Sequence, residues 1–279
     1  PASLIPTLKE VPMIPHADPD DAACLVHALC ERLRQVYIDP QAAEQICHYL
    51  EERLEAGEYR SAGEGEMLAL ALTIDLQETN HDEHLWVQWH AEPLPEDDEQ
   101  LRLNPEWQAQ QQEQARLENY GIRAVARLPG EVGLLELRYL HRPEWGGETL
   151  GKAMDFLAEQ RALILDLRGC TGGYPGMVAL LCSYLFSETP IHLSSIYWQD
   201  DHTTQEFWTQ AELPGRRFGG EAVFVLTSRE TFSAGEMLAQ LLQSFGRARL
   251  VGEKTDGGAH PGVSYRLAPH FEAFIPVGR

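Results

Sequence analysis

The stretch LILDLRGCTGGYPGMVALLCSYLF, residues 163–186, decides the fold. It opens with a continuous apolar run, which is typical of a strand inside a sheet. A glycine-rich segment follows, and then a second apolar run of helical length. Residues 222–228 (AVFVLTS), 234–246 (AGEMLAQLLQSFG) and 248–255 (ARLVGEKT) repeat the order of strand, helix and strand. This alternation predicts βαβ units and a largely parallel sheet with helices packed on it.

The N-terminal part of the chain has a different pattern. Apolar residues recur at helical spacing over residues 19–57, and a further helix ends near Leu76. The segment HLWVQWH, residues 84–90, alternates and indicates a strand. A hairpin is expected around Pro129-Gly130, and a polar helix in the Gln-rich tract before it. We therefore expect an N-terminal helical domain over residues 1–83 and an α/β core over residues 84–279.

Composition excludes several classes of function. Asp and Glu number 43 against 22 Lys and Arg, a formal charge of −21, which argues against binding nucleic acid or anionic membrane surfaces. No apolar run reaches 18 residues, so we expect no membrane span. The 5 cysteines form no CxxC pair, which argues against a disulfide framework or a thiolate zinc site. We expect neither a metal nor a cofactor.

The start of the chain bears on its compartment. No basic segment followed by an apolar one is present, and the cysteines look unpaired, so we expect a cytoplasmic protein. The first residue is Pro rather than Met, which leaves export open because the native N-terminus could be missing.

Ser233, in the segment TFSAGEMLAQLL, has two possible roles. Ser-x-x-Glu before an apolar run, here Ser233 and Glu236, is the capping-box pattern at the start of a helix. The same position suits a nucleophile, because helix N-terminal amides stabilise negative charge. The amide of Ala234 could then donate to an oxyanion. The local pattern alone does not separate the two roles.

The glycine-rich loop DLRGCTGGYPGM, residues 166–177, also has two interpretations. It can be a tight turn that needs positive φ angles, or it can present backbone N–H groups to an anion. It lacks both the GxxxxGK[ST] phosphate loop and the GxGxxG dinucleotide pattern. Gly172 and Gly173 are the candidates for an oxyanion loop opposite the serine.

Titratable residues in two further segments are candidates for a base. His81 and His84 in NHDEHLW could be surface or core residues, a metal pair, or, for one of them, a general base, but no HExxH frame is present. In VGEKTDGGAHPG, residues 251–262, Lys254 and His260 are titratable. A lysine base would need desolvation to lower its pKa, so a surface lysine is the simpler interpretation.

Together these segments resemble the tail-specific, or C-terminal-processing, serine peptidase family, which includes the tricorn core protease and the modules of interphotoreceptor retinoid-binding protein. The resemblance lies in residues 163–186 and 223–262, in that order, and more weakly in residues 72–87, and it covers most of the chain from about residue 22. The absence of a PDZ-like insert between residues 90 and 150 fits the retinoid-binding-protein branch. The resemblance implies an α/β fold with a crotonase/ClpP-like β/α core and an N-terminal helical bundle.

The resemblance also implies roles for individual residues. Ser233 matches the nucleophile, and the amides of Ala234 and of Gly172 or Gly173 match the oxyanion hole. One branch of the family uses a lysine base about two dozen residues after the serine, where this chain has none. The other branch uses a histidine that His84 matches, so His84 is the expected base and Lys254 the less fitting alternative.

Members of this branch continue beyond the position of Arg279 into a stretch with an acidic residue that orients the histidine. The core is therefore expected to lack its C-terminal end, and the orienting acid is expected either to be absent or to come from a residue not yet identified. A chain without that acid is expected to have little activity. The implied partners are peptide or protein substrates, through cleavage of unfolded or C-terminal segments, and further copies in a homo-oligomer. The alternative function is a non-catalytic carrier of a retinoid or fatty acid.

Overall fold

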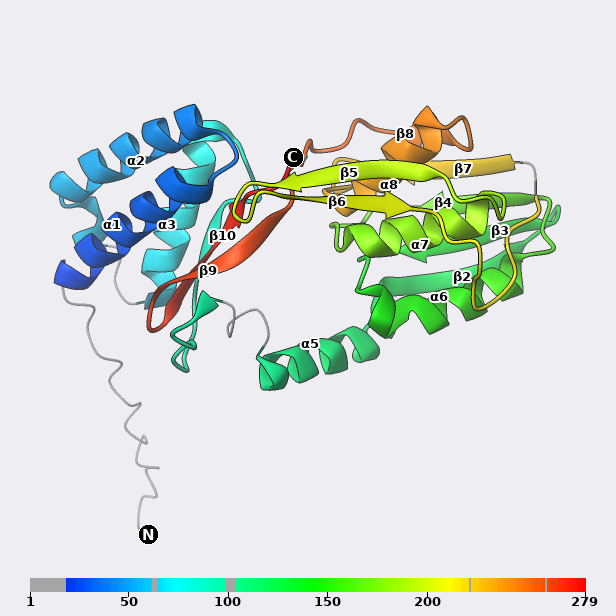
Figure 1. Cartoon of the computed structure of the whole chain (residues 1–279), viewed down its shortest axis with the longest axis horizontal. Coiled ribbons are helices and arrows are strands. Elements are labelled where there is room, and N and C mark those ends of the chain that lie inside the picture. Colours follow the sequence, from blue (N-terminus) through cyan, green and yellow to red (C-terminus); the bar gives the residue numbers. More distant parts are fainter. Residues whose placement is uncertain (1–18, 62–64, 99–103, 221, 259) are drawn as a thin grey trace, which may run out of the picture.

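The computed structural model describes residues 19–61, 65–98, 104–220, 222–258 and 260–279. Two packed regions lie side by side along the longest axis of the molecule (Figure 1). One holds the N-terminal helices and the other a sheet covered by helices. The predicted fold class, α/β with an N-terminal helical region, is confirmed.

The larger region is built on a five-stranded sheet of order β2-β3-β4-β7-β8. Strand β3 pairs with β4, β4 with β7 and β7 with β8 in parallel, whereas β2 pairs with β3 as an antiparallel hairpin. The predicted, largely parallel sheet is therefore present. Its strands are β2 (Ile122–Leu128), β3 (Val132–Leu137), β4 (Ala162–Asp166), β7 (Ala222–Thr227) and β8 (Arg249–Gly252).

One face of this sheet carries the main core. Leu135, Leu165 and Val225 lie in register across three strands and are fully buried. Each such side chain contributes about 1.5–3 kcal/mol of burial free energy. The helices whose apolar residues complete this core are α6 (Pro143–Leu157), α7 (Pro175–Leu185) and α8 (Ala234–Ser244). Because β4 and β7 are parallel, the loops after them meet at one edge of the sheet.

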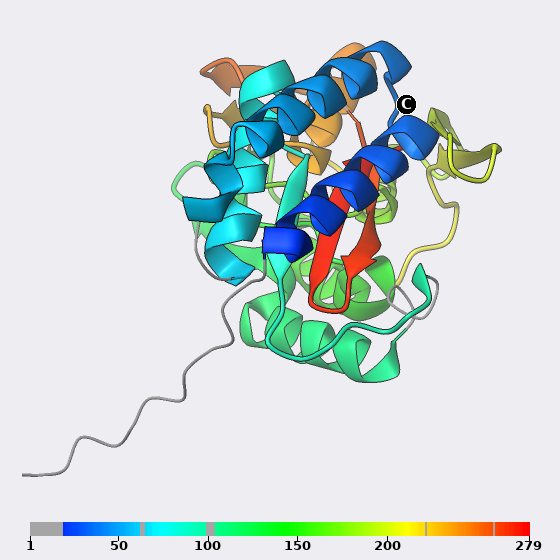
Figure 2. The ribbon, with the colours of Figure 1, turned by 90° about the vertical axis from the view of Figure 1, so that its left-hand side faces the viewer.

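The second core combines both ends of the chain. The helices are α1 (Pro19–Val36), α2 (Pro40–Glu55) and α3 (Gly65–Asn80), and the strands are β1 (Trp86–Trp89), β9 (Gly262–Ala268) and β10 (Phe271–Pro276). The strands form an antiparallel sheet of order β1-β10-β9. Figure 2 shows the dark-blue helix α1 crossing in front of the red strands. Leu85, Val87, Ala273 and Ile275 are buried with the helices.

The predicted boundary at residue 83 remains a prediction. The strands β1, β9 and β10 all follow this boundary in the sequence, yet they pack with the helices that precede it. Strand β1 follows the boundary directly, and β9 and β10 lie near the other end of the chain. The helices therefore bury their apolar faces partly against residues from the predicted second domain.

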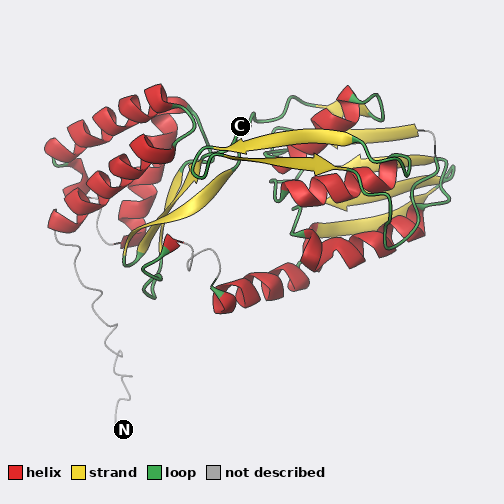
Figure 3. Cartoon of the chain, viewed as in Figure 1, coloured by secondary structure: helices red, strands yellow, loops and turns green. Residues whose placement is uncertain are grey.

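The remaining elements are a two-stranded ribbon, one helix and two short helical turns. A long two-stranded ribbon of β5 (His192–Trp198) and β6 (Thr203–Trp208) was not predicted (Figure 3). The polar helix α5 (Pro105–Leu117) is present as predicted. Two short 3₁₀ turns, η1 (Glu58–Ser61) and η2 (Asn119–Gly121), complete the described elements. In the described part of the chain, no helix is both long and apolar enough to cross a bilayer.

Candidate active site

Ser233 occupies a strained turn between β7 and α8. Its φ of 52° and ψ of −120° are rare for a residue with a side chain and cost about 1–3 kcal/mol. The Phe232 N–H donates to the Cys170 carbonyl at 2.9 Å, and the Ser233 N–H donates to the Glu236 carboxylate at 2.8 Å. These bonds hold the serine loop against the glycine-rich loop.

Glu236 fastens a second segment at the same point. Its carboxylate also accepts the N–H groups of Gly257 and Gly258, each at 2.8 Å. A Cβ on Gly258 would lie 2.7 Å from Cε1 of His84 and closer still to the Phe232 ring. The glutamate of the predicted capping pattern therefore ties the serine turn to a glycine segment that packs against His84.

His84, from the helical region, faces Ser233, from the region built on the five-stranded sheet. Its Nε2 lies 3.0 Å from the Ser233 Oγ, although 149 residues separate the pair in sequence. The histidine lies in the turn between α3 and β1 and is 8% exposed. Its ring packs against Phe232 in a tilted arrangement, with a ring-centroid distance of 4.4 Å. The structure thus brings together the residues predicted as nucleophile and base. Their catalytic roles remain predictions.

The other ring nitrogen of His84 faces Asp82, which the sequence analysis missed. The Nδ1 atom lies 3.5 Å from Oδ1 of Asp82, and the same oxygen accepts the His84 backbone N–H at 3.1 Å. The Tyr37 hydroxyl donates to the other oxygen at 2.9 Å. Burial would raise the pKa of Asp82, but the bonds from His84 and Tyr37 outweigh it and lower that pKa. Asp82 is therefore ionised at neutral pH.

A local signal for Asp82 was present in the sequence. An aspartate two residues before a candidate base can turn its side chain back to that residue's backbone, as Asp does in short turns. The family resemblance placed the acid beyond Arg279 or left it unidentified. The described residues thus offer a carboxylate beside His84 from its own loop.

The glycine-rich loop lies opposite the serine. Gly172 has a φ of 115°, and a Cβ there would lie 2.9 Å from the Ser233 Cβ. The Leu140 N–H donates to the Gly172 carbonyl at 2.8 Å, and the Tyr174 N–H donates to the Leu140 carbonyl at 2.7 Å. This parallel pairing turns the N–H of Gly173 away from Leu140.

The backbone N–H groups at this site bear on which residues could form the predicted oxyanion hole. Burial raises the pKa of the Cys170 thiol to about 11, while a bond from the Gly172 N–H opposes this rise. Within the described residues, the N–H groups of Gly173 and Ala234 donate to no acceptor. Gly173 and Ala234 therefore remain candidates for the two donors, with Gly172 as the predicted alternative to Gly173.

Replacing Gly172 by alanine is expected to lower kcat for peptide hydrolysis by about 10- to 1000-fold, in the range seen when oxyanion donors are lost. The added Cβ would push against the Ser233 Cβ at 2.9 Å and displace the loop that carries Gly173. Gly130→Ala is the matched control, because Gly130 also has a positive φ, of 85°, but nothing within 4 Å of the added Cβ. Equal kcat values for the two variants would contradict the prediction.

The other candidate residues lie apart from this contact. Lys254 is exposed in the loop after β8, and no hydrogen bond or ion pair joins it to Ser233 among the described residues. It therefore lacks the burial that a lysine base needs. His81 and His260 are also exposed. Over the same described ranges, no group of three or more His, Cys, Asp or Glu side chains is placed to hold a metal ion.

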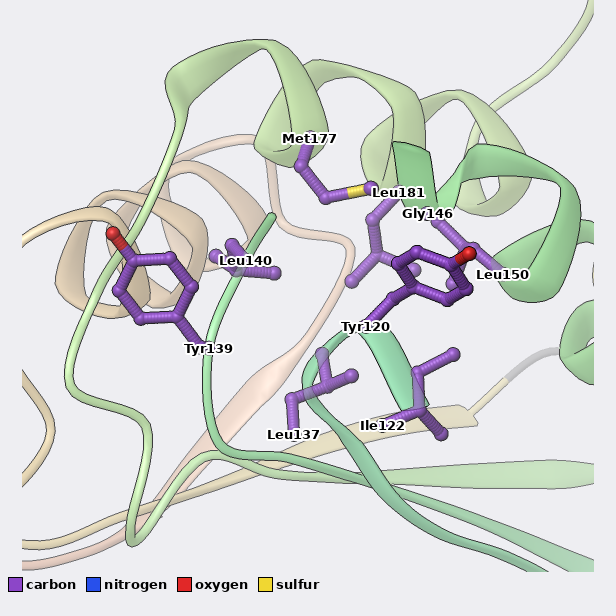
Figure 4. Close-up of a pocket in the computed structure, with 9 residues that line it drawn as sticks. All are labelled: Tyr120, Ile122, Leu137, Tyr139, Leu140, Gly146, Leu150, Met177 and Leu181. Carbon is purple, nitrogen blue, oxygen red and sulfur yellow. The ribbon is translucent and has the colours of Figure 1, made fainter. Parts of the chain in front are cut away.

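An apolar pocket lies behind the glycine-rich loop (Figure 4). Leu140, which pairs with Gly173, lines it together with Met177 of α7 and Tyr120 of η2. Neither Ser233 nor His84 lines it. The pocket is thus separate from the serine–histidine contact.

Two family models match the chain and together span most of it. Residues 136–273 match the model of peptidase family S41, and residues 21–125 match the model of the N-terminal domain of S41 peptidases in eukaryotic interphotoreceptor retinoid-binding protein. The chain belongs to peptidase family S41. The predicted family is confirmed, and it supports a serine peptidase that acts on peptides or proteins.

Solved structures of S41 proteases and related proteins share the fold. A lipoprotein from Streptococcus agalactiae aligns over 97% of this chain and 88% of its own, with a TM-score of 0.57 at 14% identity. A candidate S41 protease from Bacteroides fragilis aligns over 57% of this chain and 45% of its own, with a TM-score of 0.52 at 22% identity. Tricorn protease aligns over 92% of this chain and 32% of its own, with a TM-score of 0.51 at 11% identity.

Proposed function

We propose that the chain is a serine endopeptidase that cleaves unfolded or C-terminal peptide segments through Ser233 and His84. The observation that carries the proposal is the 3.0 Å contact between the Ser233 Oγ and the His84 Nε2. This distance lies within reach for proton transfer from nucleophile to base. The contact sits at the start of α8 and opposite a glycine loop with free amides, which is where an attacked carbonyl would need stabilisation.

The first half of the reaction forms an acyl-enzyme. The Ser233 Oγ attacks the scissile carbonyl carbon while its proton passes to the His84 Nε2. The carbonyl oxygen becomes an oxyanion, which the N–H groups of Gly173 and Ala234 can bind. When the tetrahedral intermediate collapses, the C–N bond breaks and the leaving amine takes the proton from His84. One peptide fragment departs and the other remains as an ester on Ser233.

The second half repeats these steps with water. His84 accepts a proton from a water molecule as its oxygen attacks the ester carbonyl, and the same amides bind the new oxyanion. Collapse breaks the bond to Ser233, whose oxygen takes the proton back from His84. The products are a carboxylic acid and the restored serine, so no cofactor is consumed.

The burial of His84 and Ser233 favours a substrate with an extended backbone. His84 is buried, Ser233 is half-buried, and the Gly172 loop and the Gly257-Gly258 segment flank them. A substrate backbone that passes between these segments would bring a carbonyl to the Ser233 Oγ. A folded protein surface cannot supply such a backbone without local unfolding, which favours unfolded or C-terminal segments as substrates.

A fluorophosphonate reagent, which forms a bond to activated serines, tests the proposal. We expect mass spectrometry to find the label on Ser233 in the wild-type chain and no label in His84→Gln. Ser195 is an internal control, because its Oγ also contacts a histidine, the exposed His192, at 2.9 Å but lies on strand β5. Label on neither serine, together with no cleavage of unfolded casein, would reject the proposal.

The alternative, a carrier of a retinoid or fatty acid, has less support from the site. The apolar pocket of Figure 4 offers suitable lining, but a carrier requires no contact between Ser233 and His84. Retinol titration followed by tryptophan fluorescence separates the two functions. Saturable quenching that is equal in wild type and Ser233→Ala, without fluorophosphonate labelling, would favour the carrier.

A further inference from the structure

We propose that Asp82 orients His84 for catalysis, so that the carboxylate of the catalytic group comes from the base's own loop. The inference rests on the proposed peptidase function and adds a positioning residue to it. The family resemblance placed this acid beyond Arg279 or left it to a residue not identified from the sequence. The structure instead places the Asp82 carboxylate 3.5 Å from the His84 Nδ1.

The chemistry of the imidazole requires an acceptor at that place. To take a proton from Ser233, the Nε2 atom of neutral His84 must carry the lone pair, so Nδ1 must carry the hydrogen. Nδ1 is buried and makes no hydrogen bond within the described residues. An unsatisfied buried donor costs about 1–3 kcal/mol, which would favour the wrong tautomer. The Asp82 carboxylate removes this cost once the 3.5 Å gap closes, as such contacts do when substrate binds.

Asp82 is itself held from two sides. The Tyr37 hydroxyl, just after the end of α1, donates to one carboxylate oxygen at 2.9 Å. The Asn80 side-chain amide donates to the Tyr37 hydroxyl at 2.7 Å, and the Asn80 side-chain oxygen accepts the Asp82 N–H at 3.1 Å. The carboxylate side chain is only 16% exposed. It is therefore a fixed group rather than a mobile surface charge.

Asp82 also shapes the backbone turn, and this structural role is distinct from orienting the His84 imidazole. Its Oδ1 accepts the His84 backbone N–H at 3.1 Å, which shapes the turn between α3 and β1. Asparagine keeps an oxygen at Oδ1 and forms the same turn. Asp82→Asn therefore preserves the turn and removes only the charge that favours the Nδ1–H tautomer.

The kinetic test compares Asp82→Asn with Glu83→Gln, which removes the same charge from the exposed neighbouring residue. Asp82→Asn is expected to lower kcat by about 100- to 10,000-fold, as in triads that lose the orienting acid, with KM within about two-fold of wild type. Glu83→Gln is expected to stay within about two-fold for both constants. The rate at which fluorophosphonate labels Ser233 should fall in parallel with kcat. Asp82→Glu should restore part of the loss, because it returns a carboxylate.

A second readout does not depend on turnover. Nitrogen NMR can report the tautomer of each of the 11 histidines, and the signal missing from His84→Gln identifies His84. We expect His84 to carry its proton on Nδ1 in the wild type. In Asp82→Asn we expect a shift towards the tautomer protonated on Nε2. The same tautomer in both proteins, or wild-type kcat in Asp82→Asn, would overturn the inference. If Ser233→Ala also leaves hydrolysis unchanged, the proposed function fails instead, and the tautomer still decides the role of Asp82.

Discussion

Ser233→Ala is expected to lower kcat/KM for hydrolysis of an unfolded peptide by about 10⁴- to 10⁶-fold, as loss of the nucleophile does in other serine peptidases. Without the Oγ no acyl-enzyme can form, and His84 has no proton to accept from the enzyme. The residual rate would come from the amides of Gly173 and Ala234 and from substrate binding. The measurement is steady-state hydrolysis of a fluorogenic peptide, with active-site labelling to count competent molecules.

The fold should survive this substitution. The mutation leaves the Ser233 N–H free to donate to Glu236 as before, and the lost contact to His84 is worth about 0.5–1.5 kcal/mol of net stability. The thermal midpoint should therefore change little. Ser195→Ala is the matched control, since it removes the hydroxyl of the exposed Ser–His contact on β5 and should retain full activity. Wild-type hydrolysis by Ser233→Ala would remove this serine from the mechanism.

His84→Gln is expected to lower kcat/KM by a similar factor, about 10⁴- to 10⁶-fold, because nucleophile and base act as one unit. Glutamine fills much of the space beside Phe232 but accepts no proton at neutral pH. The double variant Ser233→Ala/His84→Gln should be no slower than either single variant, since either change alone already removes the shared step. Stopped assays over long times measure these low rates.

Two other histidines provide controls for this substitution. His192→Gln removes the imidazole from the exposed contact with Ser195, and His81→Gln removes one from the same loop as His84. Both should keep hydrolysis within about two-fold of wild type. A strong loss of hydrolysis in His81→Gln, together with retained hydrolysis in His84→Gln, would identify His81 as the base. That result would contradict the proposed pair.

Much of the fold and the core of the site could be predicted from the sequence because the signals were local. The continuous apolar strands β4 and β7, each followed by a loop and a helix, specify a parallel sheet and place both loops at one edge. Ser233 and the Gly172-Gly173 pair lie in those loops. His84 required the family resemblance, since nothing local joins it to a serine 149 residues away.

What the sequence did not predict depends on distant pairing or on side-chain direction. Strands β9 and β10 bury residues against α1–α3, and no local pattern indicates that the two ends of the chain share a core. The ribbon β5–β6 was missed because most of β6 is exposed and lacks an apolar repeat. Asp82 was missed because it lies in a turn, where the sequence does not show which way a carboxylate points.

The pairing of β1 with β10 has a consequence for synthesis in the cell. Strand β1 follows directly after His84 and finds its sheet partner only in residues 271–276, with Trp86 opposite Phe274. A ribosome therefore releases Ser233 and its loop before the strand that fixes the imidazole exists. We therefore expect the contact between Ser233 and His84 to form only after residues 271–276 have emerged.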